Sequence, residues 1–483
     1  MMKFKYIAIS LLAVGLFSCK PEMKESFEPN KGSVDFSTYI ALGNSLTAGY
    51  ADGALYHSAQ KLSYVSIMAG KLSEVGGGEF IQPVVNSEQG VLPGKLTLAV
   101  VNGNLTPVPA QDGELDPFYP PIDYAVHNLG VPGAKVLHLL APGYGKFENV
   151  ALGLANPYFV RFASSPDISV IEQAVNMNPT FFSLWIGNND VLGYASNGGV
   201  KDMITPIGQF TTYYDLLVKS LNNTGAKGVL ATIPSVKSAA FFNTIPGNGL
   251  PLNSITAEAL NGGIALVEQK VNMILSMAGL PAFSYGINFT SGNNAFLIED
   301  KNFLYKDLFN AIADTSTDMF AKIFLKQAQF RQLSLQDNEL ITLKTPQDSL
   351  AMGMGSFMEI AGHMVPFGIP DRYILEKDEI ENIDQAVTAF NDVIKSFATQ
   401  YDWALVDINS KFNEMKDGVI IDGIELSAEY VKGGIFSLDG IHLTPRGNAV
   451  VSNFFIEAIN KQYGASISTV NIGAYPAIEF PNE

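Results

Sequence analysis

Short apolar runs alternate with amphipathic segments along most of the chain, and this pattern predicts strands that alternate with helices. Five short runs predict strands, and the run at 180–186 is apolar at nearly every position, which is typical of a strand buried on both faces of a sheet. The five runs are residues 38–42, 124–129, 180–186, 227–233 and 403–408. Apolar residues three or four positions apart predict helices from about residue 60 and at 213–221, 380–401 and 446–459. Strands and helices in alternation indicate an α/β fold with a parallel sheet and right-handed crossovers.

Two stretches do not fit a minimal sheet, and we interpret them as insertions. Residues 76–122 are rich in Gly, Pro and Asn and contain a predicted hairpin that turns at Asn102-Gly103. The second insertion covers about residues 240–370. It holds two predicted helices and a segment rich in Met, Gly and Phe, at 256–277, 303–330 and 351–367. We therefore expect one domain over residues 36–470 with two insertions, followed by a C-terminal tail at 471–483.

The first residues are predicted to lie outside this domain. Residues 1–18 have two lysines followed by an uncharged apolar run, which is typical of a secretory signal peptide. Cys19, the only cysteine, follows Leu16-Phe17-Ser18, and this block resembles a bacterial lipobox, in which the cysteine is lipidated. The alternative is an ordinary signal peptide with an accidental cysteine. Residues 19–35 are polar and are predicted to form a tether.

A lipidated Cys19 predicts a secreted protein anchored by its N-terminus to a membrane of the bacterial cell envelope. Lys20 follows the cysteine, in place of the aspartate that would retain such a protein at an inner membrane. The sequence therefore favours the outer membrane.

Composition indicates a folded chain and narrows the possible partners. Hydrophobic residues make up 47% of the 483 positions and charged residues only 16%, the reverse of a disordered composition. Lys and Arg number 30 against 47 Asp and Glu, which gives a net charge of −17. Because nucleic acids are bound through clustered basic side chains, this balance argues against a nucleic-acid partner.

Candidate chemistry gathers where the predicted strands end, which is where ligands bind in open parallel sheets. Ser45 follows the first strand in Gly43-Asn44-Ser45 and is a candidate nucleophile. The elbow of α/β-hydrolases requires glycine two residues after the serine, but Thr47 stands there, so that signature is absent. A Gly-x-Ser turn by itself is weak evidence.

The candidate general base is His442, one of five histidines. Its loop enters the predicted C-terminal helix, where Thr444 and Pro445 suit the N-cap and the first helical position. Asp439, three residues earlier, can reach the histidine Nδ1 if the loop folds back. The alternative is a loop histidine beside a helix cap.

Two residues could stabilise a developing oxyanion by donating hydrogen bonds. Gly133 follows the second predicted strand and can present a bare backbone N–H. Asn189 follows the third strand and can present a side-chain amide. Taken singly, each is better explained as a turn residue.

Taken together, these motifs occur in order, and in this the chain resembles the SGNH, or GDSL-type, hydrolase family of esterases and lipases. The matching blocks are Gly43-Asn44-Ser45-Leu46, Asn128 to Gly133, Gly187-Asn188-Asn189-Asp190 and Asp439-Gly-Ile-His442. The resemblance spans about residues 36–465, interrupted by the insertions. Asn44 stands where the family usually has Asp, a departure that bears on catalysis and not on the fold.

The resemblance implies a three-layer α/β/α, flavodoxin-like fold with a five-stranded parallel sheet in the order 2-1-3-4-5. It also implies serine acyl-transfer chemistry without a metal or an organic cofactor. In that chemistry Ser45 is the nucleophile, His442 the general base, and Asp439 the residue that orients it. The oxyanion hole would comprise the backbone N–H groups of Ser45 and Gly133 and the amide of Asn189.

The insertions are expected to decide the substrate, a small-molecule or lipid ester. Tyr50, Tyr56 and Phe367 are candidates to line an acyl cleft, although core packing explains each of them as well. We expect lipid or other apolar acyl esters. One alternative is a polysaccharide O-acetyl esterase with a shallow, polar, aromatic-lined cleft. The other is a non-catalytic envelope lipoprotein that binds a lipid, a glycan or an outer-membrane protein.

Overall fold

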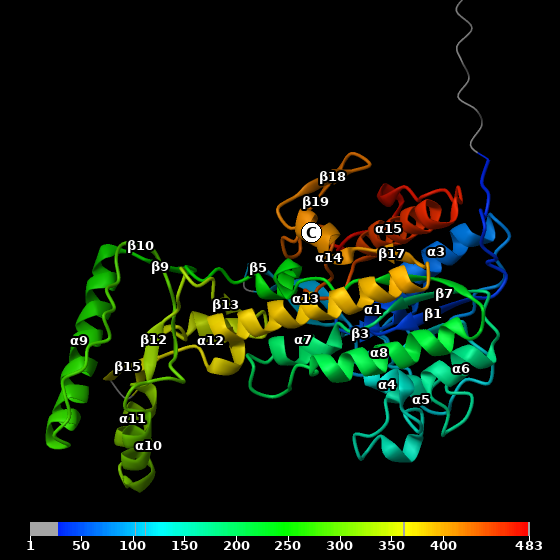
Figure 1. Ribbon diagram of the computed structural model, residues 1–483. Coiled ribbons are helices and arrows are strands. Elements are labelled where there is room, and N and C mark those ends of the chain that lie inside the picture. Colours follow the sequence, from blue (N-terminus) through cyan, green and yellow to red (C-terminus); the bar gives the residue numbers. More distant parts are fainter. Residues whose placement is uncertain (1–27, 102, 112, 361–362, 482–483) are drawn as a thin grey trace, which may run out of the picture.

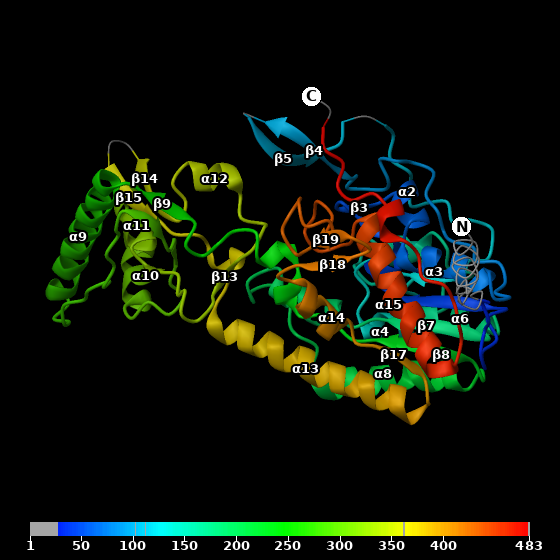
Figure 2. The ribbon, with the colours of Figure 1, turned by 90° about the horizontal axis from the view of Figure 1, so that it is seen from above.

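The computed structural model describes residues 28–481, apart from 102, 112 and 361–362. The predicted signal peptide, Cys19 and most of the predicted tether lie outside these residues. Within them, the chain forms a sheet-based domain and a separate lobe, seen from two directions in Figures 1 and 2.

A five-stranded parallel sheet organises the domain, in the spatial order β17-β8-β7-β1-β6. Counted along the chain, this is the order 2-1-3-4-5, which confirms the predicted topology. The strands are β1 (Tyr39–Gly43), β6 (Asn128–Gly130), β7 (Phe181–Trp185), β8 (Lys227–Ala231) and β17 (Ala404–Val406). All five predicted strands are present, but four are shorter than predicted, and two of these, β6 and β17, have only half the predicted length.

Local competition for the backbone explains the two short strands. Strand β6 pairs with β1 only from Asn128 onward, because the preceding N–H, that of His127, donates instead to Ile81 in the first insertion. Strand β17 stops at Val406 because the side chain of Asp407 caps the next helix, α14 (Ile408–Met415), by accepting the N–H of Ser410. The predictions for residues 124–127 and 407–408 as strand were therefore wrong.

Alternate residues of each strand enter separate cores on the two faces of the sheet, as the pleat requires. In β1, Ile40 packs on one face, whereas Tyr39 packs on the other. The first face is covered by α4 (Val136–Leu140), α6 (Val170–Asn176), α8 (Ile207–Asn222) and α13 (Lys377–Gln400). The second is covered by α3 (Tyr64–Ser73) and α15 (Pro445–Tyr463). These layers form the α/β/α sandwich that the sequence predicts.

Short helices and hairpins lie in the segments that connect the strands of the sheet with its long helices. The helices are α1 (Ser45–Ala48), α2 (His57–Lys61), α5 (Pro157–Val160) and α7 (Asn189–Ala195). Two antiparallel hairpins are β2 (Tyr50–Ala51) with β3 (Ala54–Leu55), and β18 (Val419–Ile421) with β19 (Ile424–Leu426). The predicted hairpin of the first insertion is β4 (Leu96–Val101) with β5 (Asn104–Pro109); Asn102, in its turn, lies outside the described residues.

The second insertion forms the lobe, which extends away from the sheet (Figures 1 and 2). It contains α9 (Ser254–Met277), α10 (Lys306–Thr315), α11 (Met319–Gln327), α12 (Gln347–Ala351) and the hairpin of β14 (Ser356–Ile360) with β15 (His363–Phe367). The shorter strand pairs are β9 (Leu250–Leu252) with β10 (Gly292–Asn294), β11 (Leu297–Glu299) with β12 (Phe330–Gln332), and β13 (Leu340–Ile341) with β16 (Ile374–Leu375). The lobe buries a core of its own between α9, α10 and α11.

The predicted helix at 303–330 is two helices. Helix α10 ends at Thr315, and Asp318 begins α11 by accepting the N–H of Phe320. Because Asp is a strong N-cap, the capping signal overrides the continuous apolar spacing.

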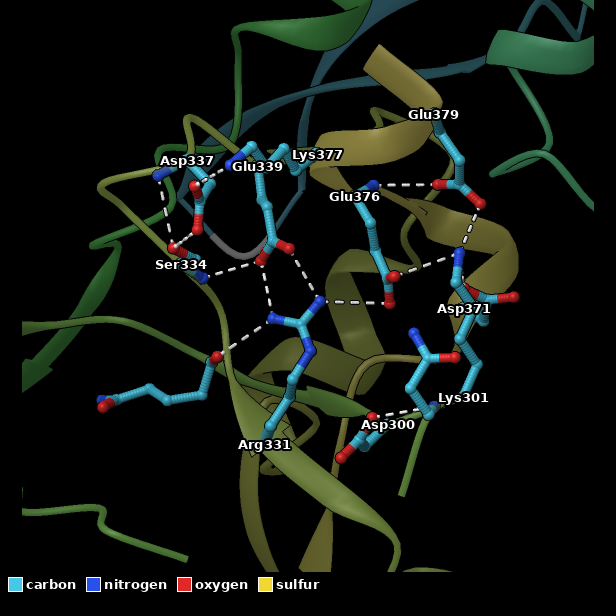
Figure 3. A network of polar contacts seen from close by, with 12 residues as sticks. Asp300, Lys301, Arg331, Ser334, Asp337, Glu339, Asp371, Glu376, Lys377 and Glu379 are labelled. Carbon is cyan, nitrogen blue, oxygen red and sulfur yellow. Dashed lines mark hydrogen bonds and ion pairs between the residues drawn. The ribbon is translucent and has the colours of Figure 1, made fainter. Parts of the chain in front are cut away.

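A network of charged side chains lies where the lobe meets α13 (Figure 3). Lys301 contacts Glu376 at 3.1 Å and Asp371 at 3.7 Å, and it also pairs with Glu379. Arg331 of the lobe pairs with Glu376 at 3.1 Å, and it pairs with Glu339 at 2.7 Å. Two cations from the lobe thus hold the N-terminal turn of α13.

In the part of the chain that the structure describes, no helix has both the length and the apolar character needed to span a bilayer.

Candidate active site

Ser45 lies directly beyond the end of β1, as the first residue of the short helix α1. Asn44 caps this helix, because its Oδ1 accepts the N–H of Leu46 at 3.0 Å. The Asn44 side chain is buried, so its oxygen performs the structural task that an aspartate would perform there without adding a charge. Gly43 is required by space: a Cβ at this position would overlap Thr47 and the carbonyl of Trp185.

The structure brings Ser45, His442 and Asp439 into contact, although they come from opposite ends of the chain. The Nε2 of His442 is 2.8 Å from the Oγ of Ser45, and its Nδ1 is 2.8 Å from Oδ2 of Asp439. Oδ1 of Asp439 accepts the N–H groups of Ile441 and His442 at 2.9 and 2.8 Å. The loop therefore folds back over three residues, and Thr444 caps α15 as predicted.

Asp439 is held in its ionised form. Burial alone would raise the pKa of Asp439, but the imidazole of His442 and the two loop N–H groups outweigh that effect and hold the pKa well below its usual range. A carboxylate in this position favours the tautomer of His442 that carries the proton on Nδ1. The unprotonated Nε2 then faces the serine hydroxyl and can accept its proton.

The Asn189 amide lies at the same cavity as Ser45 and His442, at the start of α7. Its Nδ2 donates to the carbonyl of Ala134 at 2.9 Å, which fixes the amide and leaves its second hydrogen for another acceptor. Gly133 is exposed and has φ +79°, but it is not among the residues that line this cavity. The structure therefore places Asn189 at the cavity and Gly133 in the loop beside it.

Asp190 holds this loop and was not singled out from the sequence, although it belongs to the third motif. Its Oδ2 accepts the N–H of Val136 at 3.0 Å, and its Oδ1 accepts the hydroxyl of Thr205 at 2.7 Å. Asn189 and Asp190 thus bond the carbonyl of Ala134 and the N–H of Val136, in the segment that follows Gly133. Burial raises the pKa of Asp190 to about 6.

The cavity beside Ser45 is small and mostly apolar, with a volume of about 60 Å³. Its apolar walls include Leu192, Ile233, Phe242, Phe412 and Phe436. Leu192 lies on α7 and Phe412 on α14, while the other three lie in the segments after β8 and before α15; the sequence marked none of the five as substrate-lining.

None of the three residues predicted to line an acyl cleft is among the residues that line this cavity. Tyr50 packs its ring against the imidazole of His442, with centroids 4.6 Å apart, and donates its hydroxyl to the carbonyl of Gly53. Tyr56 faces a second cavity of about 400 Å³, beneath the ammonium of Lys95. Phe367 belongs to the lobe hairpin. Aromatic side chains pack in many settings, so their type alone does not locate them.

Among the described residues, no three His, Cys, Asp or Glu side chains form a group that could hold a metal ion. The arrangement of hydroxyl, imidazole, carboxylate and amide donor is suited to acyl transfer, in which a serine attacks a carbonyl carbon and fixed donors bind the resulting oxyanion.

No family model and no curated protein matches the chain. Solved structures give weak likenesses. A putative GDSL-like lipase from Parabacteroides merdae is 10% identical, with a TM-score of 0.34 over 89% of this chain and 99% of that one. LAE5, an alpha/beta hydrolase from the metagenome of Lake Arreo, is 12% identical, with a TM-score of 0.33 over 88% and 96%. The acetyl xylan esterase AlAXEase is 12% identical, with a TM-score of 0.30 over 87% and 98%.

All three structures are named as lipases, esterases or hydrolases. With TM-scores this low, the function is better argued from the geometry of the site.

Proposed function

We propose that the protein is a serine hydrolase of carboxylic esters, of the SGNH type. The observation that carries this proposal is the contact of Ser45 Oγ with His442 Nε2 at 2.8 Å, with Nδ1 of the same ring held by Asp439. A histidine bonded on both sides in this way can accept a proton on Nε2 while the carboxylate stabilises the resulting imidazolium.

The reaction follows from these contacts. Ser45 Oγ attacks the ester carbonyl carbon as His442 Nε2 takes the hydroxyl proton, and the Asn189 amide and the Ser45 N–H bind the oxyanion. The tetrahedral intermediate collapses, the bond to the alcohol breaks, and the alcohol leaves with the proton from His442. Water then gives a proton to His442 and attacks the acyl-serine. As the second tetrahedral intermediate collapses, the bond to Ser45 Oγ breaks, His442 returns the proton to that oxygen, and the acid is released.

The substrate class follows from the cavity. A water molecule needs roughly 10–15 Å³ by the same volume measure, so about 60 Å³ holds an acyl group of only a few carbons. Apolar walls favour an uncharged acyl chain. We therefore propose short-chain acyl esters, a group that includes acetyl esters.

Labelling with a fluorophosphonate probe tests the nucleophile. The wild-type protein should be labelled, and Ser45→Ala should not be labelled while it unfolds at the same temperature. Ser220→Ala, a change at a partly exposed serine on α8, is the matched control and should label like the wild type. Hydrolysis of p-nitrophenyl esters should fall by at least about 1,000-fold in Ser45→Ala.

The chain-length series separates the alternatives. Rates that peak at acetyl to butyryl esters and fall at octanoyl support the small acyl cavity, and the reverse order contradicts it. A folded wild-type protein with no Ser45-dependent labelling would instead favour a non-catalytic envelope lipoprotein.

We also propose that Cys19 anchors the protein to the outer membrane of the bacterial envelope. The lipobox-like block before the only cysteine supports this. Metabolic labelling with a fatty acid should mark the wild type and not Cys19→Ser. Equal labelling of both would contradict the anchor.

A further inference from the structure

The Asp52-Gly53 turn, which joins β2 to β3, is bonded to the loop that carries Asp439 and His442. The N–H of Asp52 donates to Ser437 Oγ at 3.0 Å, and the N–H of Leu438 donates to Asp52 Oδ1 at 2.9 Å. The N–H of Gly53 donates to Oδ2 of Asp439 at 2.9 Å. One tight turn thus contacts three consecutive residues, the last of which is the carboxylate that holds the imidazole.

We propose that Asp52 is a positioning residue that clamps this loop and thereby fixes Asp439 against His442; the proposal rests on the function proposed above. Oδ2 of Asp439 bonds both the imidazole Nδ1 and the Gly53 N–H. The turn therefore sets the direction from which the carboxylate meets the ring. Residues that orient a functional side chain in this way commonly change activity by 10–100-fold when removed.

The backbone of the turn suits this task. Asp52 has φ +51° and Gly53 has φ +80°, the left-handed values that a two-residue hairpin turn requires. Asp tolerates this region better than most residues, so the side chain that bonds Leu438 stands at a position few other residues could occupy.

The Asp52 carboxylate is itself held from the opposite side. Tyr56 donates its hydroxyl to Oδ2 of Asp52 at 2.6 Å, while Oδ1 bonds Leu438. Burial raises the pKa of Asp52, the bonds from Tyr56 and Leu438 lower it, and nearby Asp439 raises it. The Asp52 carboxylate thus accepts bonds from Tyr56 and Leu438, whereas the Asp439 carboxylate accepts bonds from Gly53 and from its own loop.

A second hairpin contains the same kind of turn, but that turn is not bonded to the loop of Asp439. Asp422 and Gly423 join β18 to β19 with φ +51° and +79°, and Oδ2 of Asp422 accepts the N–H of Ile472 at 3.1 Å. The two turns match in sequence, backbone and kind of bond, but Asp422 does not contact the loop of Asp439. Asp422 is therefore an internal control for the structural cost of losing such a carboxylate.

Three variants of the full-length chain test the clamp. Asp52→Gly keeps the backbone freedom and loses the acceptor, whereas Asp52→Asn keeps an acceptor oxygen for Leu438. Asp422→Gly makes the same change in the control turn. We expect kcat to fall by about 10–100-fold in Asp52→Gly, with KM within about two-fold, because the loss affects orientation and not binding. Asp52→Asn should retain kcat within a few-fold, and Asp422→Gly should match the wild type.

Two further readouts separate positioning from a loss of folding. In Asp52→Gly the acidic limb of the kcat/KM profile should move to lower pH, because a displaced carboxylate stabilises the imidazolium less. A low-field Nδ1–H resonance of His442 is expected in the wild type, and it should be lost or exchange-broadened in Asp52→Gly. Both should stay unchanged in Asp422→Gly.

The outcomes are decisive in either direction. Asp52→Gly with a wild-type kcat, pH profile and Nδ1–H resonance overturns the clamp, and so does an Asp52→Asn variant as impaired as Asp52→Gly. If Asp52→Gly does not fold, Tyr56→Phe removes one donor to Asp52 and should lower kcat by about two- to ten-fold, whereas no change overturns the clamp. Should the wild type show no Ser45-dependent hydrolysis, the proposed function fails, and the resonance alone decides the clamp.

Discussion

The carboxylate of Asp190 is buried, and we expect this burial to make the free energy of unfolding depend on pH. Its pKa is raised from 3.8 to about 6 by burial, so between these values the folded protein binds more protons than the unfolded chain. The free energy of unfolding therefore decreases as pH rises through this interval, and the loss is complete above pH 6. At neutral pH, the ionised side chain of Asp190 beside the candidate oxyanion loop therefore lowers the free energy of unfolding.

Replacing this carboxylate by an amide should remove the pH dependence. In Asp190→Asn, the free energy of unfolding relative to the wild type should increase by about 3 kcal/mol from pH 4 to pH 8. Urea denaturation at several pH values measures this difference. A difference that stays constant across the range would show that Asp190 titrates normally.

At the scale of residues, the sequence predicts the contacts of a side chain best when the partner lies in the same motif. Asp439 and His442 are three residues apart, so their contact follows from local spacing. Asp190 and Asp52 bond backbone groups of distant segments, and such bonds leave no local pattern. Tyr56 was misplaced because an aromatic residue near a candidate serine looks the same whether it lines a cleft or packs behind a loop.

At the scale of elements, strand β6 and helix α1 lie so close that only glycine fits between them. A Cβ on Gly130 would meet the backbone nitrogen of Ala48 well inside van der Waals contact. Because α1 begins with Ser45, the packing that admits this contact also sets the position of the hydroxyl. The fit of two short elements thus supports the candidate nucleophile.

A methyl group at this position should push the two elements apart. Gly130→Ala should lower the free energy of unfolding by about 1–3 kcal/mol and reduce fluorophosphonate labelling. Gly208→Ala, in open space in the first turn of α8, should be neutral or stabilising by up to about 1 kcal/mol. Equal stability of the two variants would contradict the packing argument.

Element types follow from the sequence more reliably than element ends. The apolar runs of β7 and β8 predict their strands within two residues at each end, since both strands are buried inside the sheet. Strand β17 ends early because one side chain, Asp407, caps a helix there. Ends are set by single polar contacts, which hydrophobic patterns do not record.

For the whole molecule, the charged network in Figure 3 joins two bodies with separate cores. Lys301 faces Asp371, Glu376 and Glu379, so three acidic groups share one ammonium. Burial raises the pKa of Asp371 and of Glu379, which shows that their charges are already costly. Removing the cation would leave these carboxylates facing one another.

Lys301→Met should therefore destabilise the protein by about 3 kcal/mol at pH 8. The loss should shrink toward pH 4, because protonation of the carboxylates relieves their repulsion. Lys326→Met removes a cation from a well-exposed pair with Asp314 and should cost less than about 0.5 kcal/mol. Denaturation of both variants at the two pH values checks this, and a Lys301→Met loss that is independent of pH would argue against the network.

At this scale, alternating strands and helices predict a parallel sheet with right-handed crossovers, whereas the order of its strands was predicted only from the resemblance of the motifs to a known family. The direction in which the lobe extends could not be predicted in this way. It depends on contacts such as Arg331 with Glu376, which join segments that no repeating pattern relates.

Ser45 and His442 are 397 positions apart in the sequence. During synthesis, Ser45 therefore emerges from the ribosome long before His442, the residue that would activate its hydroxyl. In the proposed acyl-transfer chemistry, the nascent chain cannot hydrolyse an ester until its last helix, α15, has packed on the sheet. The cell that makes this protein would then be spared its activity during synthesis.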